Sequence, residues 1–187
     1  MTDLSQGVAL ERAAPLKVDC NRRDVDVRVE TGLGIAKLRI CGCDAQLRFG
    51  EITGTPPPGV NEQLDLAGLA IAGLAPGEWM VTGPEAKVRA WTALIEAAEK
   101  DDVLAVEITD ARVSFLVSGR EASAVIASHC PLDLGDDAFP AGTIARSLFA
   151  ETGMFIERLS DTEDEPCFRI IVDQAMAPHA ARMLAAG

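Results

Sequence analysis

Residues 106–122 read VEITDARVSFLVSGREA and contain two strand patterns, a turn and the start of a helix. The runs DVLAVEIT and RVSFLV are rich in β-branched residues, and Asp110-Ala111 between them predicts a hairpin. The following GREASAVIASH has the composition of a helix. Ser118, followed three residues later by Glu121, predicts a capping box, in which each side chain binds the other residue's backbone amide.

The same design occurs 36 residues earlier in VTGPEA, residues 81–86, where Thr82 and Glu85 predict a second capping box. LAGLAIAGL, the turn APGE and WMVTG predict a hairpin before it, and PEAKVRAWTALIEAAEK predicts a helix after it. Helical spacing places five side chains on one buried stripe: Val88, Trp91, Leu94, Ile95 and Ala98. We therefore expect two related strand–strand–helix units.

The amino-terminal third predicts a further hairpin and then a stiff connection. Residues 24–30 and 36–40 alternate apolar and charged side chains, and TGLG between them predicts a turn. The segment 43–64 contains GTPPPGVN, whose prolines disfavour both helix interiors and central strands. The expected organisation is an arm at 1–22 that orders on a partner, the hairpin and Pro-rich connection at 23–64, and one compact α+β domain at 65–187.

The carboxy-terminal third predicts three more strands, TIARSLFA, MFIERL and CFRIIVD, followed by a helix that has Pro178 in or just before its first turn. The acidic run DTEDE at 161–165 is interpreted as a solvated hairpin tip. Because strands come as hairpins with helices between them, the predicted class is α+β with mostly antiparallel sheets.

The charge of the chain excludes some partners. Among 187 residues, 29 acidic side chains outnumber 17 basic ones, which gives a net charge of −12. Such a chain repels nucleic-acid backbones and anionic membrane surfaces, so neither is expected as a partner. Five cysteines and an amino terminus without a signal-peptide pattern predict free thiols in the cytoplasm.

The stretch SHCPLDLGDDAFPAG, residues 128–142, contains the residue types of a nucleophilic site. His129 and Cys130 are expected at the carboxyl end of a helix, where the partial negative charge disfavours an anionic sulfur. We interpret the stretch as a shaped loop, with Pro131 and Pro140 restraining its ends. In this loop Leu132, Leu134 and Phe139 return to the core, while Asp136 and Asp137 stay solvated. A small thiol enzyme using Cys130 is the alternative.

Other candidate sites are weaker. The Cys41-Gly42-Cys43 pair could begin a metal site, but no spacing supplies the remaining ligands, and a turn is the simpler interpretation. GLG at 32–34 lacks the third glycine of a dinucleotide loop and is followed by a strand pattern. Trp79 is expected to be buried, with a flat partner surface as the alternative. The residues by themselves therefore predict a folded domain with no catalytic, cofactor or metal site.

Several motifs together resemble the gamma subunit of heterotetrameric sarcosine oxidase. They are LAPGEWMV at 74–81, VEITDARVSFLVSGREA at 106–122, CPLDL at 130–134, FPAG at 139–142 and the ARSLF strand. The resemblance covers residues 65–172 well and the amino-terminal third only in outline. Asp173, Gln174 and Ala175 stand where the family tends to have an Arg-Ser-Phe-like start to its last helix.

The resemblance implies a fold of the aminomethyltransferase (glycine-cleavage T-protein) folate-binding family. It also implies alpha, beta and delta partner subunits that oxidise sarcosine to glycine, transfer the one-carbon unit to tetrahydrofolate and form hydrogen peroxide. FAD, FMN, NAD and folate are then expected on the partners, and this chain acts as a scaffold. A stand-alone folate-binding protein and a subunit of a related N-methyl amino-acid dehydrogenase are the alternatives. The candidate interface residues are Trp79, Pro131, Leu132, Asp133, Phe139 and Arg146.

Overall fold

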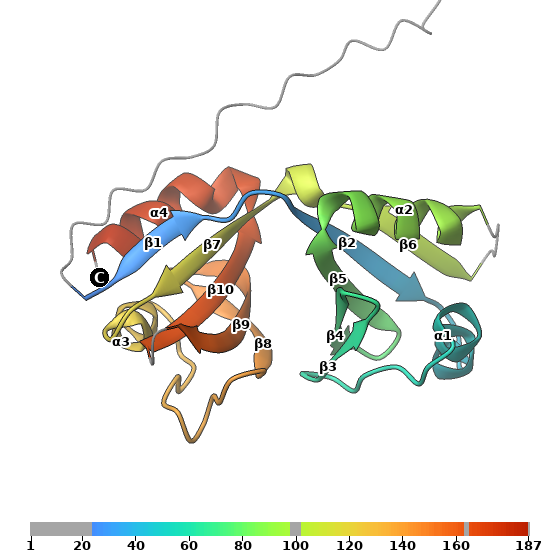
Figure 1. Ribbon diagram of the computed structural model, residues 1–187, viewed down its shortest axis with the longest axis horizontal. Coiled ribbons are helices and arrows are strands. Elements are labelled where there is room, and N and C mark those ends of the chain that lie inside the picture. Colours follow the sequence, from blue (N-terminus) through green and yellow to red (C-terminus); the bar gives the residue numbers. More distant parts are fainter. Residues whose placement is uncertain (1–23, 98–101, 163–164, 187) are drawn as a thin grey trace, which may run out of the picture.

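The computed structural model describes residues 24–97, 102–162 and 165–186. Figure 1 shows these residues as two sheets that meet at the centre of the molecule, each with helices on its outer face. The predicted arm at 1–22, with Cys20, and the end of the predicted stripe at Ala98 lie outside the described residues.

Both sheets have five strands, and all pairs between neighbouring strands are antiparallel. Sheet A has the order β1-β7-β10-β9-β8, comprising Asp26–Val29, Arg112–Ser118, Glu165–Asp173, Thr152–Thr162 and Ile144–Phe149. Sheet B has the order β3-β4-β5-β2-β6, comprising Gln63–Leu66, Leu69–Ala75, Glu78–Pro84, Leu33–Ile40 and Val103–Glu107. The predicted α+β class with antiparallel sheets is confirmed.

The helices cover the outer faces of the sheets. Helices α1 (Ala45–Thr53) and α2 (Glu85–Glu96) pack on sheet B, in a core that includes Phe49, Val81 and Val88. Helices α3 (Ala122–Ala127) and α4 (Ala177–Ala186) pack on sheet A. Burial of these apolar faces supplies the main driving force for folding. No helix in the described residues is long and apolar enough to cross a bilayer.

Two of the predicted hairpins are wrong, because their strands belong to different sheets. Strand β1 pairs with β7, whereas β2 pairs with β5 and β6, so the turn at 30–32 carries the chain from sheet A to sheet B. Likewise β6 lies in sheet B and β7 in sheet A, joined by the 3-10 turn at Thr109–Ala111. We call these two connections between the sheets the crossovers. They lie side by side, and the Ile35 amide donates a hydrogen bond to Thr109 Oγ1 at 3.0 Å. The two predicted strand–strand–helix units therefore have different pairings.

The remaining hairpins, β4–β5, β8–β9 and β9–β10, are confirmed. Of the acidic run, Asp161 lies at the end of β9 and Glu165 begins β10, while residues 163 and 164 lie outside the described residues. Pro178 lies in the first turn of α4. The segment predicted as a connection contains helix α1, which sequence analysis missed. The division of the chain at residue 65 stays a prediction.

Both predicted capping boxes are wrong. Thr82 lies within β5, which continues to Pro84, and α2 begins after it without a side-chain cap. Ser118 ends β7, and α3 begins only at Ala122. In both places strand pairing holds the backbone extended where a cap residue was expected. The buried stripe of α2 runs through Val88, Thr92 and Ile95, whereas Leu94 is 73% exposed.

Candidate functional site

The inner faces of the two sheets meet through a small apolar contact. Strand alternation sends one set of side chains outward to the helices and the other set inward toward the opposite sheet. The inward side chains that form this contact are Ile35, Ala72 and Met80 from sheet B, and Ile144, Phe155 and Ile171 from sheet A. Charged side chains lie on both sides of this contact, and these are the groups available for binding or chemistry.

On one side of the contact the sheets enclose a groove with a cavity of about 520 Å³. The lining comes from both sheets and the crossover: Lys37, Leu74, Glu78, Met80, Ile108, Arg112, Arg146, Ser147, Leu148, Gly153, Met154, Phe155, Ile171 and Asp173. At its centre the Glu78 carboxylate binds two cations through Oε1. Lys37 Nζ lies 3.1 Å away and Arg146 Nη1 lies 3.4 Å away. We call this cavity the inter-sheet groove.

Strand register positions the groove's charged residues. Lys37 lies opposite Met80 in the β2–β5 pair, and Glu78 begins β5 directly after the Pro76-Gly77 turn. Arg146 lies opposite Phe155 in the β8–β9 pair. The Glu78 contact therefore joins the two sheets at the edge of their apolar contact.

On the other side of the contact lies a network around Arg169. Its Nε and Nη2 bind the two oxygens of Glu30, each at 2.8 Å, and its Nη1 binds Glu157 at 2.6 Å. Ser114 donates to Glu30 at 2.8 Å, and Gln63 of sheet B donates to Glu157 at 3.0 Å. We call these five residues the Arg169 network.

The contacts within the Arg169 network stabilise the charged forms of Glu30 and Arg169. Burial works to raise the pKa of Glu30, but the hydrogen bonds and charge of Arg169, with the Ser114 hydroxyl, together lower it. Burial works to lower the pKa of Arg169, and the Glu30 and Glu157 carboxylates raise it well above its usual range. Glu30 is therefore ionised at neutral pH and a weak proton acceptor, which fits a structural role better than a general base.

The predicted loop after α3 has the expected shape. Leu134 and Phe139 are buried, Leu132 is half-buried and Pro131 is exposed. Asp133 accepts from the Gly135 amide at 3.0 Å and so shapes the loop locally.

Arg158 in β9 anchors the same loop from the sheet. Its buried guanidinium binds Asp136 at 3.0 Å and Asp161 at 2.9 Å, and it lies over the Phe168 ring. Burial works to lower the pKa of Arg158, and the two carboxylates raise it. Asp136 is thus solvated, as predicted, but also tied to the sheet, a contact that sequence analysis missed.

The residues of the suspected thiol site face different neighbours. Cys130 is buried at 7% exposure, its thiol donates to Ser147 Oγ at 3.8 Å, and it accepts from the Leu132 amide at 3.5 Å. The His129 ring packs edge-on against Phe149, with ring centroids 5.6 Å apart. This arrangement favours the scaffold interpretation over a thiol–imidazole pair.

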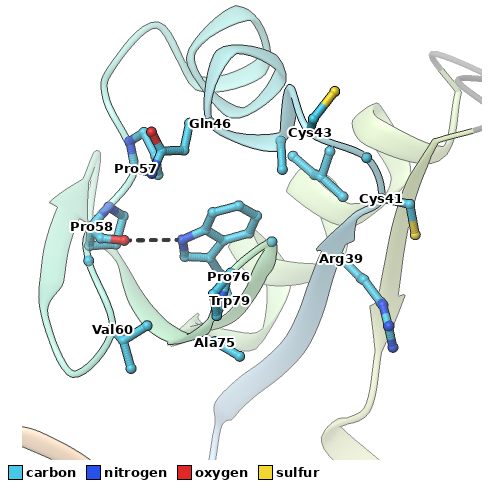
Figure 2. Close-up of a pocket in the computed structure, with 15 residues that line it drawn as sticks. Arg39, Cys41, Cys43, Gln46, Pro57, Pro58, Val60, Ala75, Pro76 and Trp79 are labelled. Atoms are coloured by element: carbon cyan, nitrogen blue, oxygen red, sulfur yellow. Dashed lines mark hydrogen bonds between the residues drawn. The ribbon is translucent and has the colours of Figure 1, made fainter.

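Trp79 forms the floor of a second cavity of about 500 Å³ (Figure 2). Its Nε1 donates to the Pro58 carbonyl at 3.4 Å, and the centroids of the Trp79 and Phe49 rings lie 4.8 Å apart. Trp79 is 3% exposed, so the expected burial is confirmed. Cys41 and Cys43 are exposed at the rim, and their sulfur atoms point away from each other in Figure 2. The described residues contain no group of three or more His, Cys, Asp or Glu arranged to hold a metal.

Known proteins resemble this chain in structure but not detectably in sequence. No protein-family profile and no curated protein matches its sequence. A chain of heterotetrameric sarcosine oxidase from Corynebacterium sp. U-96, solved with pyrrole 2-carboxylate, matches with a TM-score of 0.71 and 20% identity. That match covers 90% of this chain and 86% of the other. The glycine cleavage system aminomethyltransferase T from Bartonella henselae matches with a TM-score of 0.64 and 17% identity.

The chain has a T-protein-like fold. The match with the aminomethyltransferase covers 87% of this chain but only 46% of that enzyme, so this chain corresponds to about half of the enzyme's length.

Within this T-protein-like fold the six predicted interface residues lie in three places. Trp79 lies in the cavity of sheet B, and Arg146 lies in the inter-sheet groove. Pro131, Leu132, Asp133 and Phe139 lie in the loop on sheet A. Sequence analysis missed Lys37, Glu78 and the Arg169 network. The signal that could have found their charged members is a charged residue at an inward position of an otherwise apolar strand.

Proposed function

We propose that this chain is a non-catalytic, gamma-type subunit of a sarcosine-oxidase-type complex. The observation that carries the proposal is the reciprocal extent of the structural match. The sarcosine oxidase chain and this chain cover each other at 86% and 90%, whereas the chain covers only 46% of the aminomethyltransferase.

The described residues support a scaffold role. Glu30 and Glu157 are bound to Arg169, and Cys130 is buried beside Ser147. Nucleophilic or general-base chemistry needs an accessible group with a matched partner, and these groups are instead engaged in the fold.

In this proposal the other subunits perform the chemistry. Alpha-, beta- and delta-type partners would carry FAD, FMN, NAD and tetrahydrofolate, oxidise sarcosine to glycine and form hydrogen peroxide. This chain would support the folate-binding region of the alpha-type subunit. A related N-methyl amino-acid dehydrogenase would use the same subunit role but pass its electrons to an acceptor other than oxygen.

Co-expression of this chain with tagged alpha-, beta- and delta-type subunits from the same genome tests the proposal. We expect this chain to purify with the complex in equal amounts, and the complex to form hydrogen peroxide from sarcosine. The isolated chain should form none. Failure of the chain to purify with an alpha-type subunit would refute the proposal.

The fold similarity to the aminomethyltransferase favours one rival, a stand-alone folate-binding protein. Calorimetric titration of the isolated chain with tetrahydrofolate separates the two functions. Saturable micromolar binding by the isolated chain supports the rival, and the scaffold proposal expects none.

A further inference from the structure

The inter-sheet groove has an exposed apolar rim. Leu148 of β8 is 52% exposed, and its cross-strand partner on β9 is Gly153, so this wall lacks one side chain. A Cβ atom at Gly153 would meet nothing within 4 Å. On the opposite wall the lining includes the half-buried apolar side chains of Leu74 and Ile108. Apolar side chains on facing walls of an open groove, one of them exposed, are typical of surfaces that bind another chain.

The groove also differs in charge from the rest of the chain. Its lining has three cations, Lys37, Arg112 and Arg146, and two carboxylates, Glu78 and Asp173, a balance of +1. The whole chain has 17 basic and 29 acidic residues, so the remaining residues have 14 and 27, a balance of −13. A cationic groove within an acidic chain attracts carboxylates at short range, where solvent screening is weakest.

The ion pairs leave capacity for a further carboxylate. Lys37 and Arg146 share one oxygen of Glu78, and the Arg146 side chain is still 55% exposed. A guanidinium has five donors, so Arg146 can bind a second carboxylate while it keeps its contact with Glu78. An occupant with both an acidic and an apolar side chain would match Arg146 and the Leu148–Gly153 wall together.

We propose that the inter-sheet groove binds an acidic segment of the alpha-type subunit, with a carboxylate on Arg146 and an apolar side chain over Gly153. The inference rests on the proposed subunit function and adds the surface and the chemistry of docking. A polypeptide segment fits better than a small anion, because it covers the apolar rim as well as the cations.

Two substitutions test this in the co-expressed complex. Gly153→Leu adds a side chain to the Leu148–Gly153 wall at a position where a Cβ atom meets nothing within 4 Å, so we expect it to block the groove and leave the fold intact. Arg146→Glu reverses the charge that the acidic segment would contact. Arg120→Glu is the matched control, since Arg120 is 73% exposed and its ion-pair partner Glu165 lies 4.0 Å away. Thermal unfolding of each isolated variant confirms that it is folded.

Retention on the tagged alpha-type subunit, measured at low and high ionic strength, is the readout. We expect both groove variants to bind about tenfold or more weakly and Arg120→Glu to bind like wild type. Salt should weaken wild-type binding, and Arg146→Glu should reduce this salt dependence more than Gly153→Leu does.

Wild-type retention by both groove variants would overturn the inference and leave the subunit function intact. Loss in only one of them would also overturn it, because the proposed segment meets both positions. Absence of wild-type binding would refute the subunit function itself. A photo-cross-linking residue at Leu148 identifies the bound segment, and cross-links only to segments without Asp or Glu would contradict the acidic chemistry.

Discussion

Replacing Arg169 by leucine should destabilise the fold strongly at neutral pH. Arg169 is the shared partner of Glu30 and Glu157, and the side chains of all three are at least 84% buried, with exposures of 15%, 16% and 8%. Arg169→Leu removes three charge-assisted hydrogen bonds of 2.6–2.8 Å and leaves two buried carboxylates without their cation. Removal of one partner from a buried ion pair costs about 3–5 kcal/mol, chiefly because the remaining charge is unpaired.

The measurement is urea unfolding at pH 7, supported by calorimetry. For a chain of this size a loss of about 4 kcal/mol lowers Tm by about 8–16 °C. Arg120→Leu, at an arginine 73% exposed, is the matched control and should change stability by less than about 0.5 kcal/mol. Replacing Glu30 and Glu157 by glutamine in the Arg169→Leu background should recover part of the loss, because the unpaired charges are gone.

The loss should depend on pH with a definite sign. The pKa of Glu30 is lowered in the folded protein, so its stabilising contribution is complete above its unfolded pKa of about 4.3 and is lost as pH falls through the folded value. In Arg169→Leu the burial that works to raise the pKa of Glu30 is opposed only by the Ser114 hydroxyl and the charge of Arg28, and acidification relieves the penalty. The difference between the two proteins should therefore shrink below about pH 4.5. A loss under about 1 kcal/mol at pH 7, or one that grows on acidification, would refute this account of the network.

Three further outcomes are expected. Gly34→Ala should lower the free energy of unfolding in urea by about 1–3 kcal/mol, because its Cβ would lie 2.7 Å from the backbone of α2. Gly153→Ala, where a Cβ has open space, is the control and should be nearly neutral; equal losses would contradict the close approach of β2 and α2 at Gly34. Phe139→Ala should cost about 3–5 kcal/mol by the same assay, since this side chain is 4% exposed and holds the loop to the core; a loss near zero would show that the loop is not anchored there. Iodoacetamide should label exposed Cys41 quickly and buried Cys130 only on unfolding, as measured by site-resolved mass spectrometry; rapid labelling of Cys130 in the folded chain would revive a thiol enzyme.

Sequence alone predicted most strands but not all their partners. Alternation marks which residues are extended and which face is buried, and it does so well for β1 and for residues 36–40 of β2. The linkers at 30–32 and 108–111 have the lengths of ordinary hairpin loops, so length could not reveal that they join different sheets. Pairing depends on long-range packing, which a local pattern does not contain.

The same limit applies to the site. The loop after α3 was predicted because prolines and returning apolar residues act locally, and Leu134 and Phe139 are buried as expected. The Arg169 network joins strands from both sheets, and its hydrogen bonds connect residues up to 139 positions apart. Such a network becomes visible only when the strand order is known.

The crossovers also set an order of events on the ribosome. All strands of sheet B lie between β2 and β6 in the sequence, whereas β1 is synthesised first and has its pairing partner in β7. A nascent chain can therefore complete sheet B while Val25 and Val27, buried in the finished protein, still have no cover from β7. Because translation adds about 5–20 residues per second, this apolar strand stays unprotected for seconds, during which a chaperone can reach it.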